Sequence, residues 1–157
     1  MATRQPLDAI ALLTAEHQQV RELFQHYATV TDPDTQRQIA RAVCTVFAHH
    51  AQLEEMVFYP AFAEVTDEEG HLLVTEARAA HQAIQELMRE VLAPEADVAV
   101  FEARFLGLMD TMAAHMATEE SALYPFAADD LADRLERLRD EMVVLQQQFT
   151  TSAGESA

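Results

Sequence analysis

A histidine followed four residues later by a glutamate occurs twice in this chain, inside a repeated segment. The two copies read HAQLEEMVFYP, from His50 to Pro60, and HMATEESALYP, from His115 to Pro125, at an offset of 65 residues. On a helix, residues i and i+4 project from the same face, about 6 Å apart along the axis. Each copy therefore predicts an imidazole and a carboxylate aimed at one point, a pairing typical of metal ligands.

Two further histidines repeat upstream of these copies. His17 and His81 are each followed by a glutamine, and by a Glu-Leu pair five and six residues further on, at an offset of 64. Each half of the chain thus supplies one lone histidine and one His-x-x-x-Glu. Two helical hairpins related by a pseudo-twofold axis would bring both sets together at one level of a bundle. The predicted metal ligands are His17, His50, Glu54, His81, His115 and Glu119.

Apolar spacing and helix-breaking residues predict five helices to position these side chains. Their approximate ranges are 7–30, 35–58, 66–92, 98–124 and 129–149. Pro60 is expected to bend or end the second helix, and Pro125 to stop the fourth. The fold expected is all-α: an up-down-up-down four-helix bundle with an additional C-terminal amphipathic helix.

The apolar stripe of the fifth helix needs a partner surface, either its own bundle or a second copy in a homodimer. We expect a single domain over residues 1–150, with the bundle at about 7–127, the extra helix at about 129–149 and a flexible tail at 151–157.

Composition agrees with a helical, soluble chain. Half of the 157 residues are hydrophobic, and there are only 3 Gly, 5 Pro and no Trp, which disfavours a sandwich or barrel. The net charge of −17 argues against nucleic-acid partners and anionic membranes. No apolar run is long enough for a membrane span. A lone cysteine, Cys44, suits a reducing compartment, so we expect a cytoplasmic location.

Two buried carboxylates without cationic side chains beside them would be costly, and metal cations remove that cost. Imidazole and carboxylate ligands without a thiolate suit iron, manganese or zinc. Two carboxylates can bridge two cations, each also taking two histidines. That arrangement leaves positions open for dioxygen, peroxide or nitric oxide.

Other polar residues of the repeat are expected to lie off the site. Glu55 and Glu120 point about 100° away from the ligand face, which indicates a solvated position or a contact with the ligands from outside. Tyr59 and Tyr124 fall about 180° round from the histidine of their copy, which favours packing at the helix end. Bending at the following proline could instead bring either ring inward as an extra oxygen ligand, and Tyr27 is a weaker candidate of this kind.

At these residues the chain resembles the hemerythrin-like family, the hemerythrin HHE cation-binding domain. The resemblance covers about residues 7–127, and the repeated His-x-x-x-Glu-Glu-x-x-x-Tyr-Pro is specific to it. It implies a non-haem di-iron centre, with two oxo- or hydroxo-bridged iron ions per chain, although the residues leave manganese and zinc open. The ligands it implies are His17, His50, Glu54, His81, His115 and Glu119.

The chain departs from the oxygen-carrying hemerythrins in two positions. Those proteins have a second histidine one turn along the third helix, where this chain has Gln85, and an aspartate five residues after the last histidine, where the repeat places Glu119 at four. A four-histidine site favours an oxidoreductase that binds and turns over hydrogen peroxide, dioxygen or nitric oxide at the metals, with no separate catalytic side chain assigned. The alternative is a non-catalytic oxygen- or iron-binding sensor or storage module.

Overall fold

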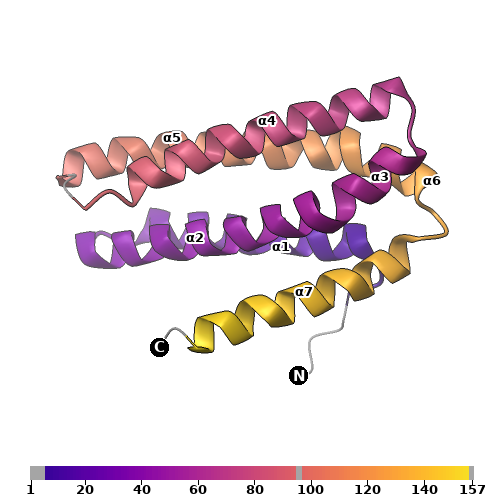
Figure 1. Ribbon diagram of the computed structural model, residues 1–157. Helices are drawn as coiled ribbons and strands as arrows, with labels where there is room; N and C mark the ends of the chain where they lie inside the picture. The colour runs from indigo at the N-terminus through magenta and orange to yellow at the C-terminus, as the bar shows by residue number, and fades with distance from the viewer. Residues whose placement is uncertain (1–5, 95–96, 156–157) are drawn as a thin grey trace.

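The computed structural model describes residues 6–94 and 97–155, and every regular element in those ranges is helical (Figure 1). Four long helices run alternately up and down. They are α1 (Ala9–Thr29), α2 (Pro33–Leu53), α4 (Glu68–Val91) and α5 (Val98–Thr118). The all-α bundle predicted from the sequence is confirmed. Within the described residues, no helix is both long and apolar enough to cross a membrane.

Each of the four long helices begins directly after an aspartate. The side chain of that aspartate accepts a hydrogen bond from the backbone N–H three residues on, which satisfies one of the unpaired donors at the helix start. Such a cap contributes about 1 kcal/mol to stability and fixes where the helix begins. The four capping residues are Asp8, Asp32, Asp67 and Asp97.

The second and fourth helices do not end before their prolines. α2 passes through a π-helical turn, η1 (Glu54–Phe58), into α3 (Tyr59–Val65), and α5 passes through η2 (Glu119–Leu123) into α6 (Tyr124–Asp130). The ends expected at 58 and 124 are therefore wrong. Proline is tolerated because it stands in the first turn of the next helical segment, where a backbone donor is not needed.

The hydrophobic core falls into two clusters along the bundle axis. One gathers the N-terminal part of α1 with α3, α6 and α7, and includes Leu13 and Phe62. The other gathers the C-terminal part of α1 with α2 and α5, and includes Phe47 and Phe105. The six predicted ligands lie where the two clusters meet along the bundle axis. The fold thus places the polar residues in the middle of an apolar bundle.

The C-terminal helix α7 (Leu135–Glu155) packs on α1 and α2, on the side away from α4 and α5 (Figure 1). It begins later than the expected residue 129, because a turn at 131–134 separates it from α6. Leu138 and Met142 are buried in the first core cluster, so the apolar stripe covers its own bundle. The chain is helical as far as Glu155; residues 156 and 157 of the expected tail lie outside the described residues.

Replacing Leu138 by alanine tests the docking of α7. The side chain is 2% exposed, so Leu138→Ala is expected to lower the free energy of unfolding by about 2–5 kcal/mol, measured by urea denaturation. The control Val144→Ala removes a side chain that is 55% exposed on the same helix, and should change it by less than about 0.5 kcal/mol. Equal effects of both substitutions would contradict the packing of α7 on the bundle.

Candidate metal centre

The structure brings all six predicted ligands together in the middle of the bundle. α1, α2, α4 and α5 each contribute one histidine, and the two π-helical turns contribute the glutamates. All six side chains are buried, and they are the buried polar or charged side chains found among the described residues. Such a cluster in an apolar core has a high desolvation cost, so its members must form hydrogen bonds and ion pairs with one another or bind an ion.

The side-chain nitrogens and oxygens face one another at short range. The Nε2 atoms of His17 and His50 are 3.0 Å apart, and Nε2 of His50 lies 3.0 Å from Oε1 of Glu54. Oε1 of Glu54 is also 3.2 Å from Nε2 of His81. In the other copy, Nε2 of His115 lies 3.0 Å from Oε1 of Glu119. These contacts join the two copies of the repeat.

The donor atoms form two groups, in each of which all atoms lie within 4.8 Å of one another. The first contains Glu54, His81, His115 and Glu119, and the second contains His17, His50 and Glu119. Each group has two histidines, and Glu119 belongs to both. The geometry can therefore hold a cation at either group, with a carboxylate between them.

Two of the histidines are held at Nδ1, the ring nitrogen that points away from the centre, by a carboxylate. Nδ1 of His50 lies 3.0 Å from a Glu16 oxygen, and Nδ1 of His81 lies 2.9 Å from a Glu55 oxygen. Because a carboxylate can only accept, each Nδ1 carries a proton, and in the neutral ring the lone pair on Nε2 then faces the centre. This tautomer is the one that binds metal ions through Nε2.

Two further observations fit a cation. Oε1 of Glu54 and Nε2 of His115 are buried, and although other site atoms lie 3.0–3.2 Å away, none of these contacts has the geometry of a hydrogen bond. In addition, metal–imidazole bonds of about 2.1 Å at a right angle separate two nitrogens by roughly 3.0 Å. The Nε2 atoms of His17 and His50 have this separation. The residues present therefore fit a metal site.

Glu55 and Glu120 lie outside the donor groups, as expected from their angle on the helix. Glu55 contacts Nδ1 of His81, and Glu120 lies 3.7 Å from Nδ1 of His17 while it accepts hydrogen bonds from Arg21. Sequence analysis missed Glu16, which reaches from α1 to His50 on α2. Its position next to His17 gives no signal of this, because the contact depends on how two helices face each other.

Tyr59 and Tyr124 do not pack at helix ends, and that expectation was wrong. Both are buried in the site, where the Tyr59 hydroxyl donates to Oε2 of Glu119 at 2.7 Å and the Tyr124 hydroxyl donates to Oε2 of Glu54 at 2.9 Å. Each tyrosine thus binds the glutamate of the other copy. Tyr27 stays out of the site and packs edge-on against Phe105.

The π-helical turns explain why the tyrosines face inward. Each tyrosine stands nine positions after the histidine of its copy, an offset that would amount to a rotation of about 180° on a regular α-helix. A π-helical turn takes up one extra residue, so the rotation becomes that of about eight residues, or 80°. The tyrosine ring then turns to the side that the ligands occupy.

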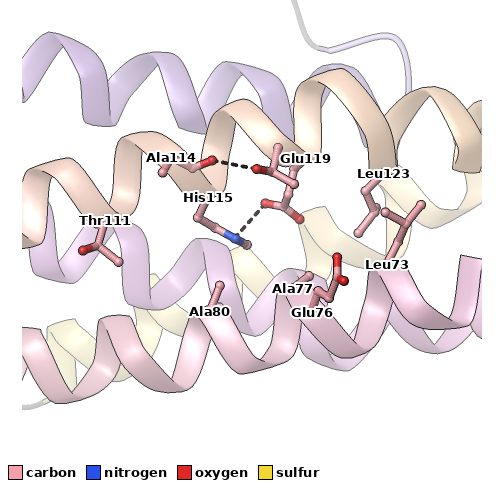
Figure 2. Close-up of a pocket in the computed structure, with 10 residues that line it drawn as sticks. Leu73, Glu76, Ala77, Ala80, Thr111, Ala114, His115, Glu119 and Leu123 are labelled. Atoms are coloured by element: carbon pink, nitrogen blue, oxygen red, sulfur yellow. Dashed lines mark hydrogen bonds and ion pairs between the residues drawn. The ribbon is translucent and has the colours of Figure 1, made fainter.

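A pocket of about 340 Å³ leads to the centre between α4 and α5 (Figure 2). Its inner end is formed by His115 and Glu119, and small side chains, among them Ala77 and Ala80 on α4, leave it open. Most of its walls are apolar, and Glu76 stands among its lining residues. Figure 2 shows His115 and Glu119 on one side and these alanines on the other.

The cluster shifts the protonation of its own members. Burial lowers the pKa of His50 and His81, but the charges and hydrogen bonds of nearby glutamates outweigh burial and raise both. Burial raises the pKa of Glu119, yet contacts with Glu54 and with three histidines hold it well below its usual range. Burial, together with the charges of Glu54 and Glu119, raises the pKa of Tyr59 and Tyr124, so both hydroxyls stay protonated donors.

Comparison with known proteins agrees with this site. The model of the hemerythrin HHE cation-binding domain family matches residues 8–127. A curated relative, an uncharacterised hemerythrin-like protein of Schizosaccharomyces pombe, is 25% identical over 118 residues. The matched region covers 75% of this chain and 58% of that relative. No solved structure matches the chain.

The thermal stability of the metal-free chain should be greatest at mildly acidic pH. His50 and His81 have raised pKa values in the folded state, so their stabilisation is complete below about pH 6.5 and is lost as the pH rises through the folded values. Glu119 has a lowered pKa, so its contribution is present above about pH 4.5 and is lost as the pH falls.

Unfolding temperatures of chelator-treated protein between pH 4 and 9 measure this profile. Bound metal requires neutral histidines, so saturation with metal should remove most of the loss above pH 6.5. A metal-free chain that is equally stable from pH 5 to 9 would contradict the proposed protonation of the cluster.

Proposed function

Because this chain belongs to the hemerythrin HHE cation-binding domain family, we propose that its buried cluster binds two iron ions and turns over a small oxidant. His17 and His50 would hold one cation and His81 and His115 the other, with Glu54 and Glu119 available to both. The observation that carries this proposal is the sharing of carboxylates: Glu119 belongs to both donor groups, and Oε1 of Glu54 lies within 3.2 Å of histidines from each.

Iron bound at these groups would supply Lewis acidity and one-electron redox chemistry. The chain itself orients the ligands and keeps bulk water away. The ring of Phe47 packs against His50, His81 and His115, with ring centroids 5.7–6.0 Å apart. On the opposite side, the hydroxyl protons of Tyr59 and Tyr124 hold the outer oxygens of the two glutamates. The inner oxygens are thereby directed toward the histidines.

The pocket between α4 and α5 supports access by a small neutral molecule. Its walls are mainly apolar, and the acidic Glu76 in its lining disfavours anions. Hydrogen peroxide, dioxygen and nitric oxide all fit this description. Hydrogen peroxide is the substrate to test first because its turnover needs no outside electron donor: one molecule is oxidised to dioxygen by loss of two electrons and two protons, and a second takes them up to form two water molecules.

The second candidate function is a sensor or storage module that binds oxygen or iron without turnover. The observation in its favour is the contact of α7 with Glu16, through the hydrogen bond that Gln146 donates. A helix that touches the surroundings of a ligand can transmit a change at the site. Binding of two iron ions with no consumption of peroxide would support this alternative.

Iron content and peroxide turnover together test the proposed function. Protein purified from iron-rich medium is expected to hold two iron ions per chain and to release dioxygen from hydrogen peroxide. Glu119→Ala should lose most of the iron, the turnover and several degrees of thermal stability, because a residue of both donor groups is gone. Glu86→Ala, at an exposed position on α4, is the control and should change none of them. Two iron ions retained in Glu119→Ala would remove Glu119 from the ligand set.

A bulky side chain in the pocket tests the access route. Ala80→Phe is expected to lower the second-order rate constant for reaction with hydrogen peroxide by about tenfold or more, with unchanged iron content, because the ring fills the space before His115. The matched control Ala79→Phe adds the same ring at the neighbouring exposed position of α4 and should leave the rate unchanged. Equal rates for the two variants would show that the oxidant enters elsewhere.

A further inference from the structure

The C-terminal helix reaches the candidate centre although it lies outside the family match, which ends at residue 127. Gln146 on α7 donates from Nε2 to Oε2 of Glu16 at 3.2 Å. The other oxygen of Glu16, Oε1, accepts from Nδ1 of His50 at 3.0 Å. Two hydrogen bonds therefore connect α7 to a histidine whose Nε2 faces the centre.

The contact from Gln146 completes a pattern seen at the other outer carboxylates. Each of these also contacts an arginine: Oε2 of Glu55 lies 3.4 Å from Nε of Arg78, and both carboxylate oxygens of Glu120 accept hydrogen bonds from Arg21. Those two pairs come from the bundle helices themselves. For Glu16 the holding group comes from α7, so the orientation of His50 depends on a helix added to the bundle.

The second half of the chain lacks this arrangement. At the repeat offset of 64, the counterpart of Glu16 is Ala80, which lines the open pocket beside His115. Between α1 and α2 the structure thus has a carboxylate in contact with α7, whereas the equivalent position between α4 and α5 has an alanine beside a pocket. The contact with Gln146 is specific to the side that α7 covers.

The surroundings keep this hydrogen-bond chain in place. The Glu16 side chain is 12% exposed, and Gln146 is half-buried. One turn along α7, the ring of Phe149 stacks on His49 at a centroid distance of 4.6 Å and an angle of 14°. These side chains line a surface pocket of about 300 Å³, so the hydrogen bonds are partly shielded from water.

We propose that Gln146 is a positioning residue for the cation held by His17 and His50, acting through Glu16 on the ring of His50. This inference rests on the proposed function, since it requires a bound cation. Without the amide of Gln146, Glu16 can turn toward water, and His50 loses the acceptor that fixes its tautomer and ring angle. Coupling between two sites is reciprocal, so occupancy of the centre also strengthens the docking of α7.

Cobalt(II) loaded into the full chain provides the test, because its visible absorption reports the ligand geometry. Gln146→Leu is expected to release one of the two cobalt ions to a chelator about three to ten times faster than the wild type, and to shift the visible band. This effect is smaller than the 10–100-fold typical of removing a direct partner of a ligand. The control Gln147→Leu, the same substitution at the next, exposed position, should match the wild type.

Two further variants separate positioning from general loss of packing. Gln146→Lys keeps a donor toward Glu16 and should restore the wild-type release rate. In a Glu16→Leu background, Gln146→Leu should cause no further acceleration, because Glu16→Leu already removes both hydrogen bonds of the chain.

The outcomes are distinct. The positioning role would be overturned if Gln146→Leu behaved as Gln147→Leu does, or if it accelerated release just as much in the Glu16→Leu background. Either result would leave the proposed function intact. A wild-type chain that binds no cobalt or iron would overturn both.

Discussion

Two carboxylates buried in an apolar helical bundle set the central constraint on this structure. Glu54 and Glu119 are about 1% exposed or less, and in the part of the chain that the structure describes no arginine or lysine is buried with them. Four imidazoles and two tyrosine hydroxyls surround them instead. The imidazole nitrogens that face the carboxylates can bind metal cations as well as protons. The rotation of α1, α2, α4 and α5 about their own axes turns these groups toward one another. The aspartate caps and the two core clusters place them at the same height along the bundle.

Helical periodicity was sufficient to predict that the six candidate side chains come together in the bundle, since the pattern is simple and occurs twice. It failed where the backbone is not an α-helix. Tyr59 and Tyr124 were assigned to the wrong face because a π-helical turn precedes each, and residue spacing gives no sign of such a turn. Glu16 escaped notice for another reason: its contact with His50 crosses from one helix to another, and such contacts depend on side-chain packing.

The two halves are alike in their ligands and different in what covers them. On one side α7 lies over α1 and α2, and Glu16 and Gln146 fill the space beside His50. On the other side Ala80 leaves a pocket beside His115. A repeated hairpin would give two equivalent donor groups, but these surroundings make them unequal. Glu16 contacts His50 of one group from outside, and His115 of the other borders a pocket.

The widened turns also bear on how such a centre can change over evolutionary time. Each π-helical turn is equivalent to a one-residue insertion just after the last ligand of its helix. The residues before it keep their direction, whereas everything after it rotates by roughly a quarter of a circle. Insertion of a single codon can therefore turn a tyrosine hydroxyl toward a buried ionic cluster, and deletion of one can turn it away. The histidine and the glutamate before the turn keep their positions in both cases.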